Sequence, residues 1–213
     1  MTMTAESAVP LTLESFVAPK TTALVMWDMQ NGLAGRANNI ETVKPAARRL
    51  LEAADRAGVL VIWSRHILPP LDLLSGPMQL FMMRKQKVDH PSKLKPFMNR
   101  GMPETDFIDG FEPAPHHVVL EKGVPSLFVD TPLDSRLKVR GIRTLVLAGV
   151  ATEIGIEFTA RHASALGYFS VAVEDATGSY ATEPHLQSLD YLRKWANVAN
   201  SEEIAAIWSE AGR

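Results

Sequence analysis

Five short and almost entirely apolar runs are spread along the chain, and helix-like segments separate them. The runs are TALVMWD (22–28), VLVIWSR (59–65), HHVVLEK (116–122), TLVLAGV (144–150) and YFSVAVEDA (168–176). Strands whose apolar residues are continuous rather than alternating are buried on both faces of a sheet. Strands that alternate with helices are joined by right-handed crossovers and lie parallel. The pattern therefore predicts a three-layer, doubly wound α/β fold with a mostly parallel central sheet.

The segments between these runs have helical character, and glycines mark several of their ends. We expect helices over residues 40–57, 132–140, 152–166 and 183–195 and a last helix from Ser201; the first three stop before Gly58, Gly141 and Gly167. Glycine commonly follows a helix because it adopts the left-handed conformation without strain. Residues 1–20 are interpreted as an N-terminal arm and residues 21–213 as one domain. The stretch 67–115 is too long for a plain crossover, so we expect a substrate-facing cap or a dimer contact there.

Composition excludes several classes of function. Hydrophobic residues make up 46% of the chain and charged residues 22%, as in ordinary globular proteins. The formal net charge of -2 gives no electrostatic footprint for nucleic acid or an anionic membrane. No run approaches the roughly 20 apolar residues that span a bilayer, and the first residues lack a secretory signal pattern, so we expect a cytoplasmic protein. The chain has no cysteine, which excludes disulfides, thiolate zinc sites and a thiol nucleophile.

Polar side chains stand at the carboxyl ends of the apolar runs. They are Asp28, Arg65 with His66, Glu121 with Lys122, Thr152 at the end of the stretch Gly149 to Thr152, and Glu174 with Asp175. Ligands of open α/β sheets bind outside these strand ends, so they are the predicted site. Three of these residues also have a structural alternative: Asp28 as a cap, Lys122 as a solvated partner of Glu121, and His66 as a rim residue.

Several other residues are interpreted as structural, and the sequence lacks the motifs of several common enzyme classes. His116 and His117 lie at the start of a strand, the opposite end from the predicted site, and Met78, Met82 and Met83 are interpreted as packing residues. There is no GxGxxG after a strand, no GxxxxGK phosphate loop, no HExxH and no GxSxG elbow. The sequence therefore gives poor support to dinucleotide, nucleotide-hydrolysis or serine-esterase chemistry, and we expect no cofactor.

Three ordered blocks carry a family resemblance. They are ALVMWDMQNG (23–32), VVLEKGVPSLFVDTPLDSRLKVRGI (118–142) and LVLAGVATEIGIEFTARHASALGY (145–168), followed by VEDA and a helix near His185. In this order and spacing they resemble the isochorismatase-like (cysteine hydrolase) superfamily over roughly residues 22–198. The resemblance implies that residues 21–213 form one hydrolase domain that acts on a small organic molecule. It also implies a homo-oligomer, either a homodimer or a homotetramer.

The resemblance implies a role for several residues. Asp28 matches the family's catalytic carboxylate, Lys122 its catalytic lysine, and the Val150–Ala151 bond its non-proline cis peptide. Gly155 stands at the position of the usual nucleophilic cysteine, where we expect it to leave room for substrate. Backbone amides from Ala151 and Thr152 to Gly155, at a helix N-terminus, are expected to face negative charge on the substrate.

Further substrate contacts are expected at three polar side chains. They are Gln30 of the Asp-x-Gln motif, and Gln79 and Arg84 in the predicted cap, with surface or packing roles as the alternative for the last two. Metal-binding nicotinamidases carry an Asp-x-His pair after the second strand. This chain reads SRHILPP there, with His66 alone, so we expect no metal.

Without sulfur, the covalent route of the amidases is closed, and neither Thr152 nor Ser126 is expected to replace it. Isochorismatases also carry glycine at this position and hydrolyse a vinyl ether. We therefore expect hydrolysis of a vinyl ether or an amide or other C–N bond by Asp28 and Lys122. A general acid must hold a proton, whereas a neighbouring cation favours the carboxylate, and the sequence leaves this conflict open. Two alternatives remain: an inactive homologue that binds small molecules, and a Cys-to-Gly variant of a cysteine amidohydrolase.

Overall fold

A central sheet of six strands organises the molecule, and every neighbouring pair of strands is parallel. The computed structural model describes residues 9–10 and 12–212. The strands are β1 (Thr22–Trp27), β2 (Leu60–His66), β3 (Val118–Lys122), β4 (Thr144–Val150), β5 (Phe169–Gly178) and β6 (Asn197–Ala199). Their order is β3-β2-β1-β4-β5-β6. The predicted three-layer, doubly wound α/β fold is confirmed, and β6 adds a short strand that the apolar runs did not predict.

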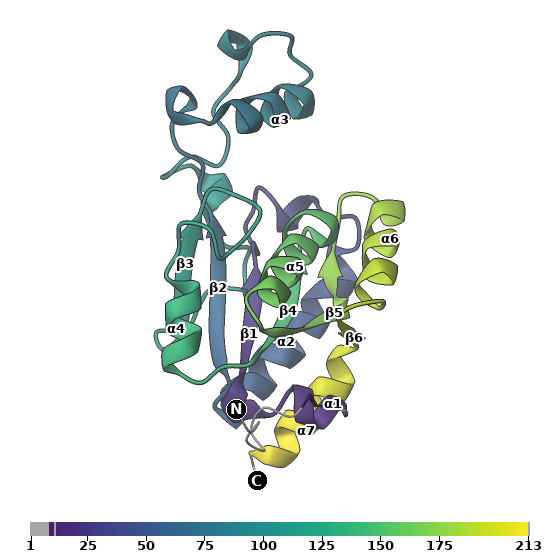
Figure 1. Ribbon diagram of the computed structural model, residues 1–213. Coiled ribbons are helices and arrows are strands. Elements are labelled where there is room, and N and C mark those ends of the chain that lie inside the picture. Colours follow the sequence, from purple (N-terminus) through teal and green to yellow (C-terminus); the bar gives the residue numbers. More distant parts are fainter. Residues whose placement is uncertain (1–8, 11, 213) are drawn as a thin grey trace.

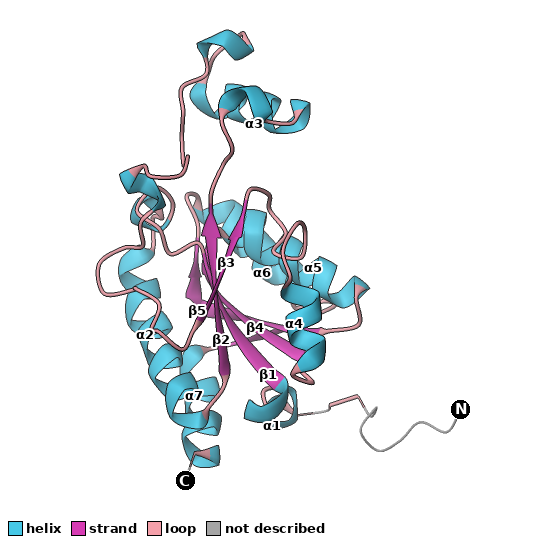
Figure 2. Cartoon of the chain, turned by 90° about the vertical axis from the view of Figure 1, so that its left-hand side faces the viewer, coloured by secondary structure: helices cyan, strands magenta, loops and turns pink. Residues whose placement is uncertain are grey.

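Helices cover both faces of the sheet (Figures 1 and 2). Helices α2 (Ile40–Ala57) and α7 (Ser201–Ala211) pack on one face, and α4 (Leu133–Val139), α5 (Glu157–Ala165) and α6 (Thr182–Leu192) on the other. Residues of β1 alternate between the two cores: Leu24 and Met26 enter the first, while Val25 and Trp27 enter the second. Burial on both faces explains why this run is apolar throughout.

Helix α2 begins and ends where the sequence predicts. Its buried residues recur at helical spacing: Val43, Ala46, Ala47, Leu50, Ala53 and Ala54. This spacing places an apolar stripe on the sheet. The helix ends because Gly58 adopts a left-handed conformation with φ 67°, and its N–H donates to the carbonyl oxygens of Ala54 and Asp55.

The described part of the predicted N-terminal arm packs against the domain. It contains the short helix α1 (Leu13–Phe16) and a 3-10 turn at Pro19–Thr21. Val17 is fully buried, and its carbonyl oxygen accepts a hydrogen bond of 2.7 Å from the Trp208 indole in α7. This contact joins the beginning of the described chain to its last helix.

Residues 67–100 form a layer beyond the carboxyl ends of the strands, and residues 101–115 return along the sheet, past Trp63 and α2, to the start of β3. Helix α3 (Gly76–Gln86) stands apart from the sheet there (Figures 1 and 2). Ser75 caps its N-terminus by accepting from the Met78 N–H, and Lys87 ends it with φ 55°. Short 3-10 turns at Leu71–Leu73, Pro91–Lys93 and Pro103–Thr105 connect it to the domain. We name residues 67–100 the cap.

Among the described helices, none is long and apolar enough to cross a membrane.

Candidate active site

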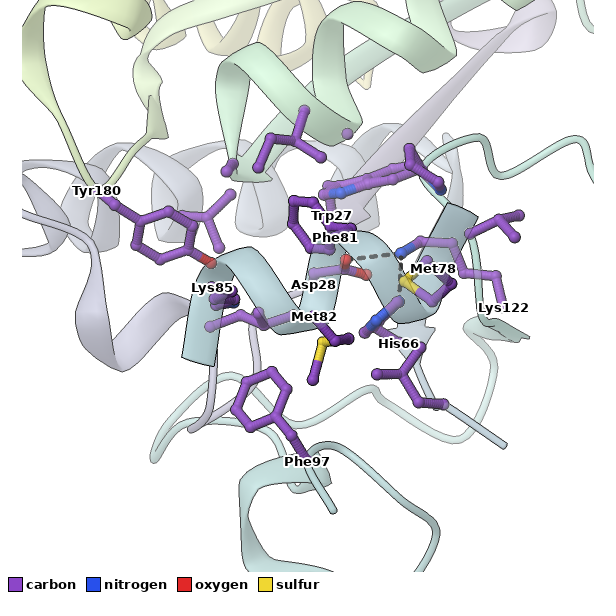
Figure 3. Close-up of a pocket in the computed structure, with 18 of the residues that line it drawn as sticks. Trp27, Asp28, His66, Met78, Phe81, Met82, Lys85, Phe97, Lys122 and Tyr180 are labelled. Carbon is purple, nitrogen blue, oxygen red and sulfur yellow. Dashed lines mark hydrogen bonds and ion pairs between the residues drawn. The ribbon is translucent and has the colours of Figure 1, made fainter. Parts of the chain in front are cut away.

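The carboxyl ends of β1, β2, β3 and β4 surround a pocket of about 380 Å³. It opens beside the neighbouring strands β1 and β4, where the strand order reverses and where open α/β sheets bind ligands. Asp28 follows β1, His66 ends β2, Lys122 ends β3 and Val150 ends β4, and all four line the pocket. Figure 3 shows Asp28, His66 and Lys122 together at its floor.

Asp28 is buried, and both of its carboxyl oxygens accept hydrogen bonds. The Ser64 hydroxyl donates to Oδ1 at 2.5 Å, and the Lys122 ammonium donates to Oδ2 at 2.7 Å. The Asp28 backbone N–H donates in turn to Ser64 Oγ at 2.9 Å. Asp28 has φ 46°, a conformation that is costly for residues other than glycine and that clusters at functional sites. The two donors fix the orientation of the carboxyl group.

Lys122 is as deeply buried as Asp28. Its ammonium contacts the Asp28 carboxylate, lies 4.5 Å from the centre of the Trp27 ring, and donates to His66 Nδ1 at 3.3 Å. Burial lowers the pKa of Lys122, while the charge of Asp28 opposes that shift. A buried ion pair of this kind is held together because each charge is the principal compensation for the other.

His66 is neutral at physiological pH. Burial, reinforced by the charge of Lys122, lowers its pKa to about 3. An ammonium can only donate, so His66 Nδ1 must accept, and the ring proton is therefore on Nε2. His66 thus presents an N–H donor in the wall of the pocket rather than a charge or a free metal ligand.

Gly155 lies beside the pocket, but the space next to it is filled. A Cβ atom at this position would stand 1.9 Å from Trp27 Nε1 and 2.3 Å from Trp27 Cε2. Real Cβ contacts are never this short, so no side chain fits without displacing the indole. The structure therefore differs from the expectation that Gly155 leaves room for substrate: the ring of Trp27 occupies that room.

The turn that contains Gly155 is wider than the single helix predicted over 152–166. Residues Thr152–Ile156 form a π-helical turn before α5, and the Val150–Ala151 peptide that precedes it is cis. The N–H groups of Ile154, Gly155 and Ile156 all donate to the Ala151 carbonyl oxygen. These three amides are thus turned into the helix. Ala151 lines the pocket, whereas the fully buried Thr152 donates to the Gly178 carbonyl oxygen and contacts His185 Nδ1.

The remaining predicted substrate contacts lie outside the pocket lining. Gln30 is fully buried: its amide donates to the carbonyl oxygens of His66 and Thr105 and accepts from the His66 N–H. It therefore ties β2 to the segment beneath the cap. Gln79 donates to the Leu74 carbonyl oxygen within the cap, and Arg84 is exposed on α3.

Three predicted strand-end residues also face other partners. The Arg65 guanidinium contacts Asp106, and Glu121 pairs with Arg100 rather than with Lys122. Asp175 accepts from the backbone N–H and hydroxyl of Ser201 at the start of α7. Its strand continues to Gly178, so Asp175 is not a strand end.

Several pocket residues were not predicted from the sequence as site residues. The cap contributes Met78, Phe81, Met82, Lys85 and Phe97, and Tyr180 follows β5. Figure 3 shows these side chains around Asp28, with Tyr180 and Lys85 to its left and Phe97 below it. The apolar residues of α3 were the available signal, since a helix rich in methionine and phenylalanine outside the sheet must cover something apolar. The methionines were interpreted as packing alone, and Lys85 had no distinguishing pattern.

Lys85 brings a second cation to the pocket. Its ammonium lies 4.7 Å from the centre of the Phe97 ring and 5.8 Å from that of Tyr180. Burial, with a smaller contribution from the charge of Arg36, lowers the pKa of Lys85. Within the described ranges, neither Lys85 nor Arg36 pairs with a carboxylate.

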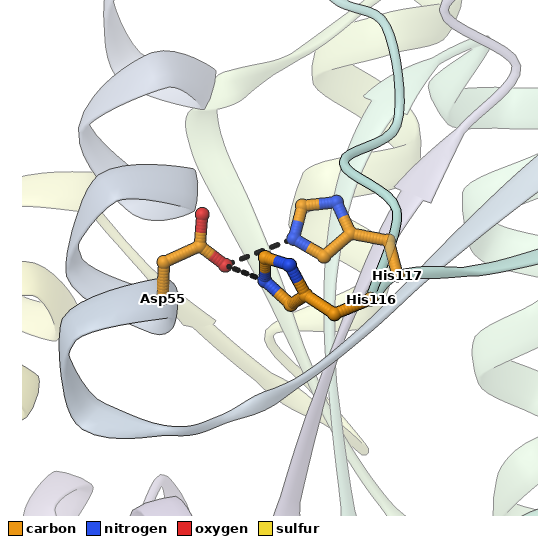
Figure 4. A group of neighbouring side chains, drawn as sticks. All are labelled: Asp55, His116 and His117. Carbon is orange, nitrogen blue, oxygen red and sulfur yellow. Dashed lines mark hydrogen bonds and ion pairs between the residues drawn. The ribbon is translucent and has the colours of Figure 1, made fainter.

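A separate group of possible metal ligands lies at the opposite end of the sheet. Asp55, His116 and His117 have ligand atoms within 4.8 Å of one another (Figure 4). His117 Nδ1 accepts from the Trp63 indole at 3.0 Å and from the Ala114 N–H at 3.1 Å. The neutral ring must then carry its proton on Nε2, which donates to Asp55 at 2.8 Å. A metal would need that nitrogen's lone pair, so this arrangement fits a hydrogen-bonded tie between α2 and β3.

Known proteins resemble this chain in sequence and in fold. Residues 22–203 match the family model described as Isochorismatase domain. A ureidoacrylate amidohydrolase, RutB of Methylorubrum extorquens, is 30% identical, and the match covers 91% of this chain and 86% of that protein. A cysteine hydrolase from Pseudomonas syringae pv. phaseolicola has the same fold, with a TM-score of 0.79 and 23% identity over 91% of this chain and 94% of its own. N-carbamoylsarcosine amidase from Thermoplasma acidophilum also has this fold, with a TM-score of 0.68 and 28% identity over 85% of this chain and 97% of its own.

Proposed function

Because the chain belongs to the isochorismatase domain family and is a hydrolase, we propose that it hydrolyses a C–N bond of amide or urea type in a small organic molecule. Asp28 acts as the general base, and water rather than a side chain is the nucleophile. The observation that carries this proposal is the arrangement of side chains at the floor of the pocket. A carboxylate stands there between two donors, and an indole fills the space beside position 155.

Asp28 is better placed as a base than as an acid. Both oxygens already accept hydrogen bonds, from Ser64 and Lys122, and a carboxylate with such partners is an acceptor for a proton of water. In the proposed step Asp28 takes one proton as the water oxygen bonds to the substrate carbonyl carbon. The proton then passes to the leaving nitrogen as the C–N bond breaks, which gives an acid and an amine. This order removes the need for a proton on Asp28 before the reaction.

Lys122 orients Asp28 and balances its charge. Its ammonium carries three protons; the contacts to Asp28 and His66 use two of them. The third can donate to the oxygen that becomes negative as water attacks the carbonyl. A buried cation is effective in this role because the surroundings are apolar and weakly screening.

The pocket lining supports a substrate with an apolar body and an anionic end. Most of the surface comes from aliphatic and aromatic side chains, including Phe81, Met82 and Phe97. Lys85 and the nearby Arg36 supply positive charge on the cap side. Asp28 is already compensated by Lys122, so an anionic group on the substrate would be the natural partner of Lys85.

The amidohydrolase and amidase among the similar proteins support C–N hydrolysis over vinyl-ether hydrolysis. The packing at position 155 argues against a Cys-to-Gly replacement in an otherwise native site. A cysteine Cβ would collide with Trp27, so the two residues are not compatible neighbours. An inactive homologue that binds small molecules remains the second candidate, because Trp27 and the cap also suit a binding pocket.

The test is a turnover screen over N-carbamoyl amino acids, simple amides and enol ethers, with the released amine or acid measured directly. We expect activity on the C–N classes and no pre-steady-state burst of amine, since no covalent intermediate forms. Asp28→Asn should reduce turnover by about 10²–10⁴-fold because the amide cannot take the proton. Asp175→Asn is the matched control, a carboxylate-to-amide change outside the pocket, and should keep activity.

Each outcome of the screen has a distinct meaning. Full activity in Asp28→Asn would refute the general-base role. Activity on enol ethers alone would reassign the bond that is cleaved. No turnover on any class, together with ligand binding in the pocket, would favour the binding protein.

We also propose a homodimer or homotetramer in the cytoplasm, with a small-molecule substrate and neither nucleic acid nor membrane as a partner. Large apolar side chains are exposed on α5 and α6, among them Phe158, Leu186 and Tyr191. Exposed apolar side chains of this size suit an interface between copies of the chain. Light scattering at micromolar concentration measures the assembly size, and a strict monomer would contradict this proposal.

A further inference from the structure

Trp27 lies in the floor of the pocket and is only 1% exposed. Its indole packs directly against Gly155, and Figure 3 shows it between the turn above and Lys122. The three ring atoms Nε1, Cε2 and Cζ2 would lie 1.9, 2.3 and 2.7 Å from a Cβ at Gly155. The ring therefore fills the direction in which any side chain at position 155 would project.

The backbone of Trp27 cannot move away to relieve such a contact. Trp27 pairs with Gly149 in the β1–β4 ladder, and Gly149 has φ 114°. A Cβ at Gly149 would stand 2.1 Å from the Trp27 carbonyl oxygen, so the two strands approach as closely as glycine permits. Gly149 holds the backbone of Trp27, and Gly155 accommodates its ring.

The Trp27 indole N–H has no hydrogen-bond partner in the part of the chain that the structure describes. Two other tryptophans that are equally buried do have one: Trp63 donates to His117 Nδ1, and Trp208 donates to the Val17 carbonyl oxygen. Among the described residues Trp195 Nε1 also lacks a partner, and it lies outside this pocket, so an unpaired indole alone does not mark a site. The Trp27 N–H differs because its ring lines the pocket, where a ligand supplies the acceptor that the protein does not.

We propose that Trp27 is the substrate-binding donor of this site, and that Gly155 is glycine because this indole occupies the space of its side chain. This role rests on the proposed function: the Trp27 Nε1–H donates to the carbonyl oxygen of the substrate while Asp28 activates water. The ring also packs against Lys122, since the ammonium lies over its face. Trp27 thus takes part in binding directly and positions Lys122 as well.

The packing half of this proposal is tested by a stability cycle that needs no substrate. Gly155→Ala should lower the melting temperature by about 4–10 °C, as overpacking of a rigid site does. The same substitution in a Trp27→Val background should lower it by less than about 2 °C beyond Trp27→Val alone, because the ring is gone. Gly35→Ala is the control, since nothing lies within 4 Å of a Cβ there. If Gly155→Ala lowers the melting temperature equally in both backgrounds, the indole of Trp27 is not what fills the space beside Gly155.

The donor half is tested by hydrogen exchange of the indole protons, observed by ¹⁵N-edited NMR and assigned with Trp27→Phe. An unpaired N–H that opens onto the pocket should exchange at least about 10-fold faster than the paired indoles of Trp63 and Trp208. Exchange as slow as theirs would show that Nε1–H is sealed from the pocket, and would overturn the donor role without any reference to turnover.

With a substrate from the screen, Trp27→Phe should reduce kcat/KM by about 3- to 10-fold, the value of one hydrogen bond. Trp63→Phe is the matched control, because it also removes one N–H from a buried strand residue but donates to His117, away from the pocket. A loss no greater than in Trp63→Phe would refute the contact to substrate. Asp28→Asn reports on the reaction separately, so failure of the proposed function and failure of this inference are distinguishable.

Discussion

Replacing Lys122 with methionine keeps most of the apolar stem of the side chain and removes its charged ammonium. In the parent chain the ammonium lies 2.7 Å from Asp28 Oδ2, and both side chains are almost completely buried. Removing one partner of a buried ion pair leaves an uncompensated charge and costs about 3–5 kcal/mol. Asp28 retains the hydrogen bond from Ser64, so we expect the lower half of this range, about 3–4 kcal/mol at pH 7.

The assay is equilibrium unfolding in urea, which needs no knowledge of the substrate. Asp28→Asn combined with Lys122→Met removes both charges, so the double variant should be more stable than Lys122→Met alone. The control is Glu121→Gln, one residue earlier in β3. Glu121 pairs with Arg100 at the surface, where such pairs contribute less than about 1 kcal/mol.

A loss of stability in Lys122→Met of less than about 1 kcal/mol, the range of an exposed pair, would refute the buried ion pair. That result would mean that water reaches the two charges in solution. Failure of the double variant to recover stability would show that the lysine contributes through packing against Trp27 rather than through its charge.

Two further predictions concern the pocket. Burial holds the pKa of His66 at about 3, below its unfolded value near 6.5. Between these two pH values only the unfolded state binds the extra proton, so the free energy of unfolding decreases as pH falls, by up to about 1.4 kcal/mol per pH unit. In urea unfolding at several pH values His66→Gln should show a smaller decrease over this range, and an unchanged slope would contradict a neutral His66. Lys85→Met should raise KM for anionic substrates by about 5-fold with little change in kcat, whereas neutral analogues in the same assay should be unaffected, and an equal effect on both would exclude an anion contact.

The elements of the domain could be predicted because their signals are local. Helix α2 has the predicted bounds, since its apolar stripe and the left-handed Gly58 both appear in the sequence. The run 144–150 becomes β4 without change because its burial on both faces requires continuous apolar residues. Asp28 and Lys122 could be identified as candidate site residues because parallel strands bring their carboxyl ends to one edge.

The features that could not be predicted depend on contacts between segments that are distant in the chain. A π-helical turn at Thr152–Ile156 replaces the first part of the α-helix that the sequence predicts over 152–166, and this turn packs against Trp27 from another strand. Nothing local to Gly155 indicates that an indole fills its space. Gln30 likewise belongs to a motif that suggests a substrate contact, yet its hydrogen bonds are all to backbone groups.

The packing of Trp27 against Gly155 has a consequence for how such a site can change by mutation. A side chain at position 155 and an indole at position 27 exclude each other, so the order of substitutions matters. The tryptophan can enter only a chain that already has glycine at 155. Once it is present, every single substitution at 155 meets the ring, and a return to a side chain there must first pass through a smaller residue at 27. The pair therefore changes at low cost only in a fixed order, and this order holds in both directions: glycine at 155 precedes tryptophan at 27, and a smaller residue at 27 precedes a side chain at 155.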